Sequence, residues 1–176
     1  MKRIALCFDG TWNKPADDSI DEGIETNVCR FREYQTIALD EHRVDFEVCL
    51  WDSDAAPEQP LEQRWFCGAH CDVGGGYPSR KLSDLPLRWM QDKAAGLGLA
   101  LDKVAVDAEN FPGDLTDSYS DFLLGEYARL KQIYYRPVFS TRFGNEQLDA
   151  SIDQRRSATL APPYAPPNSG LPPLTA

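Results

Sequence analysis

Two short apolar runs each lead directly into a turn, and this arrangement constrains the fold most strongly. Residues 3–8 and 64–69 favour strands that are buried on both faces. The first run ends at the turn-forming cluster Asp9-Gly10-Thr11-Trp12-Asn13, and the second leads into His70-Cys71-Asp72-Val73-Gly74-Gly75-Gly76. Strands of this kind occur in parallel sheets that helices cover. We therefore expect an α/β fold with a small, mostly parallel sheet flanked by helices.

Apolar spacing predicts the elements around these strands. A helix over 28–41 would form the crossover between the two strands. Alternation predicts a further strand over 46–51. The clearest helical pattern runs from 85 to 97, with a cap at Ser83 or Asp84 and a glycine at its end. A weaker pattern predicts a helix near 120–132.

The bulk properties fit one acidic domain. A chain of 176 residues is enough for a single core. We expect a truncated domain over 1–160 and a proline-rich, extended surface tail over 161–176. A net charge of −10 argues against a nucleic-acid partner. No apolar run approaches the ~18 residues of a membrane span, so we expect a cytoplasmic protein, although export without a signal peptide leaves no mark in a sequence.

The two turns carry the side chains with chemical potential. His70 is suited to act as a general base near neutral pH, and Asp72 could orient its ring or hold the loop. The turn Asp9-Gly10-Thr11 could bring backbone N–H groups to a substrate anion. The plainer interpretations are a surface histidine beside a hinge and an ordinary β-turn. We interpret the other histidine, His42, as solvated among charges.

A nucleophile to match His70 does not appear in the sequence. A hydrolase with a Ser-His-Asp triad needs a serine on a sharp strand-to-helix elbow, usually within Gly-x-Ser-x-Gly. No serine of this chain lies in that pattern. The odd count of five cysteines argues against a disulfide framework. Cys67, His70 and Cys71 have only weak resemblance to a zinc site, and we expect no cofactor.

Several motifs together resemble a known family. Their order along the chain is similar to that of the type VI secretion phospholipase effectors and their uncharacterised relatives, which are bacterial α/β-hydrolases. The motifs are Phe8-Asp9-Gly10-Thr11-Trp12-Asn13, Thr26-Asn27-Val28, Ala38-Leu39-Asp40-Glu41, and Trp65-Phe66-x-Gly68-x-His70-x-Asp72-Val73-Gly74-Gly75-Gly76-Tyr77. The resemblance implies that His70 is the base of the catalytic triad. It implies that Asp9, Gly10 and Thr11 are pocket residues, and we expect Asp72 to bind the substrate as well.

The resemblance also implies a missing segment. The family's serine elbow and triad acid would fall between Thr26-Asn27-Val28 and Ala38-Leu39-Asp40-Glu41, which lie about ten residues apart here. The expected function is therefore a phospholipase- or lipase-type esterase domain that is inactive alone. The alternatives are a non-catalytic remnant that binds a lipid or a protein, and a metal-binding protein that uses Cys67, His70, Cys71 and Asp72. An uncovered sheet edge would also favour a homo-oligomer.

Overall fold

The computed structural model describes residues 34–51 and 61–170. The predicted strand over 3–8, the turn Asp9-Gly10-Thr11 and residues 28–33 of the predicted helix lie outside these ranges. Within them, no helix has the length and the apolar character needed to cross a bilayer.

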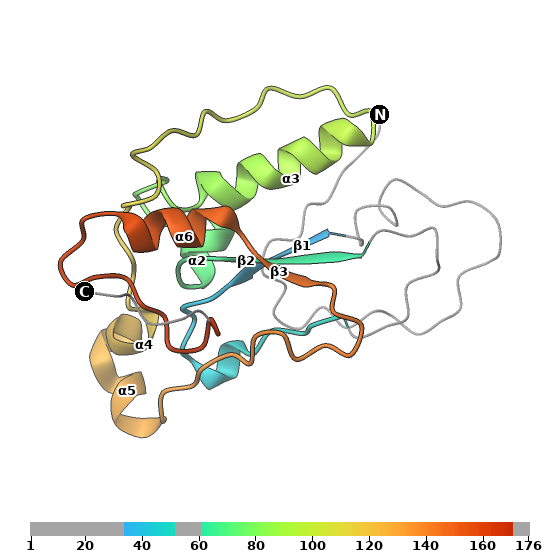
Figure 1. The fold of residues 1–176 in the computed structure, drawn as a ribbon. Coiled ribbons are helices and arrows are strands. Elements are labelled where there is room, and N and C mark those ends of the chain that lie inside the picture. Colours follow the sequence, from blue (N-terminus) through green and yellow to red (C-terminus); the bar gives the residue numbers. More distant parts are fainter. Residues whose placement is uncertain (1–33, 52–60, 171–176) are drawn as a thin grey trace.

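A three-stranded parallel sheet forms the centre of the domain (Figure 1). Its strands are β1 (Tyr34–Ala38), β2 (Glu62–Phe66) and β3 (Glu146–Leu148), and β2 lies in the middle. Ile37 of β1 is in register with Trp65 of β2, which is in register with Leu148 of β3. Helices flank this sheet, so the expected reduced α/β fold is confirmed.

The sheet is covered on both faces because neighbouring side chains of a strand point in opposite directions. One face packs against α2 (His70–Gly74) and α3 (Asp84–Gly96), and its buried members are Ala38, Phe66, Val73, Leu82, Leu85, Trp89 and Met90. The other face packs against α6 (Ala150–Ser157) and the chain near Tyr164, with Ile37, Leu39, Val48, Trp65, Cys67 and Ile152 in its cluster. The core therefore consists of two thin layers on either side of β1 and β2.

Short helical turns gather beyond the carboxyl ends of β1 and β2 (Figure 1). They are η1 (Val44–Phe46), α4 (Ser118–Asp121), η2 (Phe122–Gly125) and α5 (Glu126–Leu130), in addition to α2. In open parallel sheets this is the end where ligands bind. The fold thus places His70 and its surroundings at the ligand-binding end of the sheet.

Two predicted elements are confirmed. The strand predicted over 64–69 is β2, which begins and ends slightly earlier. The helix predicted over 85–97 is α3, which ends at Gly96 and is followed by Gly98 at a φ of 85°. Ser83 occupies the cap position, but its hydroxyl donates to the Arg80 carbonyl instead of capping the helix.

The helix predicted over 28–41 is wrong for its described part, since Tyr34–Ala38 forms β1. Gln35 and Thr36 are buried although they are polar, so the strand has neither an exposed face nor an alternating pattern. The strand predicted over 46–51 is also wrong, because η1 ends at Phe46 and the residues after it join no sheet.

Two further expectations need correction. The helix predicted near 120–132 is broken into α4, η2 and α5, because Leu123, Leu124 and Gly125 adopt positive φ. Most described residues of the proline-rich tail are exposed as expected, but the tail does not lie on the surface throughout, because Tyr164 is buried against the sheet. An aromatic side chain that enters the core holds this part of the tail in place.

Candidate functional site

His70 begins α2, four residues after β2 ends. Its backbone N–H donates to Oε2 of Glu41 over 3.1 Å. Its ring packs edge-on against Phe46, with 5.7 Å between the ring centroids and 62° between the ring planes. The side chain is half-buried. The residue that the sequence predicts as the base therefore lies at the carboxyl end of the sheet, with its backbone and its ring both supported.

The turn before His70 requires glycine at position 68. Gly68 has a φ of 113°, and a Cβ atom added there would lie 2.4 Å from Cβ of Asp72. The N–H of Gly68 donates to Oδ2 of Asp40 over 2.7 Å, and the N–H of Asp40 donates back to the Gly68 carbonyl over 3.0 Å. The motif after β1 and the motif after β2 are thus joined at the same edge of the sheet.

Asp40 is a buried carboxyl group at the base of this junction. Its Oδ2 also accepts a hydrogen bond from the Tyr164 hydroxyl at 2.8 Å. Burial raises the pKa of Asp40, and the hydrogen bonds from Gly68 and Tyr164 offset only part of that rise. Burial also raises the pKa of the neighbouring Cys67 thiol to about 12. Cys67 is therefore a neutral thiol near pH 7 and is unsuited to act as a nucleophile.

Glu41 forms a second, ionic centre beside His70. Its fully buried carboxylate accepts from Nε of Arg43 at 2.8 Å and from Nη2 of Arg43 at 2.7 Å. The Ser118 hydroxyl of α4 lies 3.1 Å from both carboxylate oxygens. Burial alone would raise the pKa of Glu41, but the hydrogen bonds and charge of Arg43 hold it below its ordinary value.

Ser118 is linked to the His70 backbone through Glu41, which accepts hydrogen bonds from both. Its hydroxyl donates to a carboxylate whose pKa is lowered, and such a carboxylate is a weak base. A serine becomes nucleophilic when a histidine or another effective base accepts its proton. The contacts of Ser118 therefore favour a structural role for its hydroxyl.

Asp72 holds the loop around α2 together. Its Oδ2 accepts from the N–H groups of Ala69 at 3.0 Å and Thr116 at 3.1 Å. Its Oδ1 accepts from the Thr116 hydroxyl at 3.0 Å. Burial raises the pKa of Asp72, partly offset by these hydrogen bonds. Of the two roles considered for Asp72, holding the loop is the one that these contacts fit, and contact with a substrate stays a prediction.

A comparison with known families gives a match to the central part of the chain. Residues 32–93 match the family described as type VI secretion system phospholipase effector Tle1-like, catalytic domain. Over these residues the chain is similar to the catalytic domain of these phospholipase effectors. No curated protein and no solved structure gives a match.

The Tle1-like segment contains the residues that meet at the carboxyl end of the sheet. It includes β1, β2, α2 and most of α3, and with them Asp40, Glu41, Gly68 and His70. The contacts from α4 and from Tyr164 come from outside the matched residues. The Tle1-like part of the chain thus supplies the centre of the site, and later residues complete its surroundings.

A shallow pocket lies beside the glycine run, between α2 and the start of α3. Its volume is about 250 Å³, and its lining consists of Val73, Gly74, Gly75, Gly76, Tyr77, Arg80, Ser83, Asp84 and Leu87. This volume is below the roughly 300–1,000 Å³ typical of ligand pockets. His70 is not part of the lining, so the pocket is separate from the candidate site.

The metal-binding alternative gains no support from the described part of the chain. Over 34–51 and 61–170, no group of three or more His, Cys, Asp or Glu side chains could hold a metal ion. Cys67 is directed to the buried side near Tyr164, where its thiol takes part in a hydrogen bond. Its place there separates it from a ligand set built around His70.

Sequence reasoning proposed roles for His70 and Asp72 but gave no role to the residues that contact them. Asp40 and Glu41 were considered as a family landmark and, together with Arg43, as charges around His42. The available signal was a pair of acidic residues directly after a strand, at the edge where ligands bind in parallel sheets. That signal was hidden because the sequence pattern predicts a helix where β1 forms. Asp9, Gly10 and Thr11 lie outside the described residues, so their pocket role stays a prediction.

Proposed function

We propose that this Tle1-like chain binds lipid esters at the His70 end of its sheet and does not hydrolyse them alone. The observation that carries the proposal is the environment of His70. Its backbone is held at the ligand-binding end of the sheet, while the nearby Ser118 hydroxyl is bonded to Glu41. In addition, the sequence has no Gly-x-Ser-x-Gly elbow. In this proposal His70 supplies a polar contact to the ester.

An apolar surface close to His70 supports a lipid as the ligand. Leu123, Leu124 and Leu130 are 64%, 100% and 81% exposed on η2 and α5. Leu123 and Leu124 directly follow Phe122, whose ring packs 6.0 Å from that of Phe46, the residue that contacts the His70 ring. Exposed apolar side chains grouped in this way commonly mark a binding surface.

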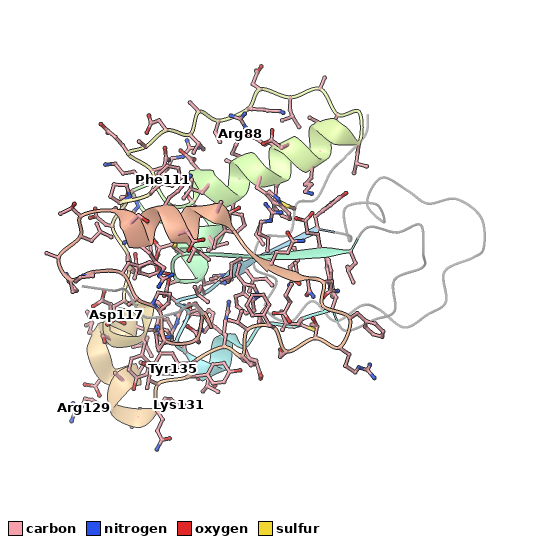
Figure 2. The ribbon with its side chains drawn as sticks, viewed as in Figure 1. Arg88, Phe111, Asp117, Arg129, Lys131 and Tyr135 are labelled. Carbon is pink, nitrogen blue, oxygen red and sulfur yellow. The ribbon has the colours of Figure 1, made fainter. Side chains whose placement is uncertain are left out.

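The charges around these leucines favour an electrically neutral lipid surface. Arg129 and Lys131 point outward beside α5 (Figure 2). Each is paired with an acid, Arg129 with Glu126 at 2.9 Å and Lys131 with Asp45 at 3.4 Å. Asp117 and Asp121 are also exposed directly before these leucines, so the local charge is slightly negative, like the −10 of the whole chain. A zwitterionic phosphatidylcholine bilayer fits such a surface better than an anionic one.

Co-sedimentation with phosphatidylcholine vesicles tests the binding half of the proposal. We expect the full chain to sediment with the vesicles, and a Leu123→Asn/Leu124→Asn variant to sediment much less. Vesicles with added phosphatidylglycerol should not improve binding. If neither vesicle type retains the parent chain, lipid binding is excluded.

Hydrolysis of a p-nitrophenyl ester tests the catalytic half, with His70→Ala as the control. We expect both proteins to hydrolyse the ester at the background rate. A parent rate well above that of His70→Ala would show that the chain is an active esterase and would overturn this part of the proposal.

A further inference from the structure

We propose that the buried Glu41–Arg43 pair is a positioning element for His70, acting on its backbone through the carboxylate and on its ring through the guanidinium. Its functional meaning rests on the proposed role of His70. The contacts themselves are made within the protein and do not depend on a ligand. Glu41 and Arg43 lie two residues apart, directly after β1, and neither belongs to α2.

The carboxylate of Glu41 anchors the start of α2. The first N–H groups of a helix have no partner within the helix. The N–H of His70 is one of these, and Oε2 of Glu41 accepts it at 3.1 Å. The same carboxylate is fixed by Arg43 and by Ser118, so the acceptor cannot turn away easily. A charged acceptor held in this way strengthens the hydrogen bond.

The guanidinium of Arg43 supports the ring of His70 from the other side. Its central carbon lies 3.6 Å from the centroid of the Phe46 ring and 4.6 Å from that of Phe122. Phe46 in turn makes the edge-on contact with the His70 ring. One buried ion pair thus reaches both parts of His70, its amide through Glu41 and its imidazole through Phe46.

Stability alone does not account for an ion pair at this position. Both side chains are almost fully buried, so their charges have lost most of their hydration. A buried ion pair can often be replaced by well-packed apolar residues without loss of stability. The apolar pair would lack the acceptor for the His70 N–H, which is the contact that matters for positioning.

The test replaces the pair without leaving a buried charge, in the variant Glu41→Met/Arg43→Met. Methionine packs well against aromatic rings, so the contact with Phe46 is largely kept. The matched control is Thr116→Val, which removes a hydroxyl-to-carboxylate bond on Asp72 at the other side of α2. Hydrogen–deuterium exchange of the His70 amide is measured in all three full-length proteins, with urea unfolding to confirm that each is folded.

We expect the His70 amide to exchange about tenfold faster or more in the double variant, as follows from the loss of a hydrogen bond to a charged group. In the double variant, amides of β2 should exchange at their parent rates. In the Thr116→Val control, the His70 amide should exchange at its parent rate. An unchanged His70 rate in the folded double variant would overturn the anchoring role of Glu41.

A second variant, Arg43→Lys, tests the ring contact and keeps the charge. Lysine lacks the planar group that lies over Phe46. Diethylpyrocarbonate modifies histidines, and the chain has two, so His42 serves as an internal reference. We expect the ratio of His70 to His42 modification to rise severalfold, and an unchanged ratio would overturn the role of Arg43. Neither readout uses a lipid or an ester, so failure here and failure of the proposed function are separate results.

Discussion

Replacing Asp40 with alanine and with asparagine separates the geometry of this group from its charge. Oδ2 of Asp40 accepts the Gly68 N–H at 2.7 Å and the Tyr164 hydroxyl at 2.8 Å. Alanine leaves both donors buried without an acceptor, at about 1–3 kcal/mol each. We therefore expect Asp40→Ala to lose about 2–6 kcal/mol of the free energy of unfolding. Asparagine can place its amide oxygen at the same point, so Asp40→Asn should lose far less.

The pH dependence of these variants has a definite sign. Burial raises the pKa of Asp40 in the folded protein, so the folded state keeps this proton at pH values where the unfolded chain has released it. The free energy of unfolding should then fall as pH rises from the unfolded pKa through the raised folded one. Asparagine does not titrate, so the free energy of unfolding of Asp40→Asn should increase relative to that of the parent across this pH range.

Urea unfolding of the parent and both variants between pH 4 and pH 8 measures these differences. The denaturant slope should be the same in all three proteins, which shows that the midpoints report stability. Equal losses for alanine and asparagine would refute the explanation from two unpaired donors. If the parent becomes more stable relative to Asp40→Asn as pH rises, the argument that burial raises the pKa of Asp40 is refuted.

Three further predictions follow from single positions. Gly68→Ala should lower the free energy of unfolding by about 3 kcal/mol or more, because alanine is strained at a φ of 113° and its Cβ would collide with Asp72. A variant as stable as the parent in urea would contradict this. Leu124→Asn should raise the thermal midpoint and stabilise the fold by up to about 1 kcal/mol, because Leu124 is fully exposed at a φ of 57° and asparagine tolerates that backbone better; a fall in the midpoint would count against it. In the folded protein a thiol reagent at pH 8 should label Cys71 well before Cys67, whose pKa of about 12 keeps it protonated; labelling of both at one rate, read by peptide mass spectrometry, would disagree.

Local sequence signals predicted β2 and α3. The segment that becomes β2 is a run of β-favouring residues, and α3 shows helical spacing that ends at glycine. β1 lacks such a signal, since it contains the buried polar residue Gln35, whose Nε2 donates to the carbonyl of Cys49, 14 residues away, at 3.2 Å. A polar residue that is buried because of its tertiary partner cannot be distinguished from an exposed one in the sequence.

The same difference between local signals and distant contacts applies to the candidate site. His70 was predictable because its glycine-rich motif is local and specific. Glu41 was not, because its partners are 29 residues away at His70 and 77 residues away at Ser118. The burial of Tyr164 depends on a partner 124 residues away, at Asp40. Contacts of this range arise only when the strands are aligned, so the hydrogen bonds around His70 could not be predicted from the sequence.

A fluorophosphonate reagent tests most directly whether His70 faces a usable nucleophile within this chain. Such reagents form a covalent adduct with a serine that a neighbouring histidine activates. The protein should remain unmodified in its intact mass spectrum after prolonged treatment, as should His70→Ala. An adduct on Ser118 or on any other serine that forms in the parent and is lost in His70→Ala would contradict the account.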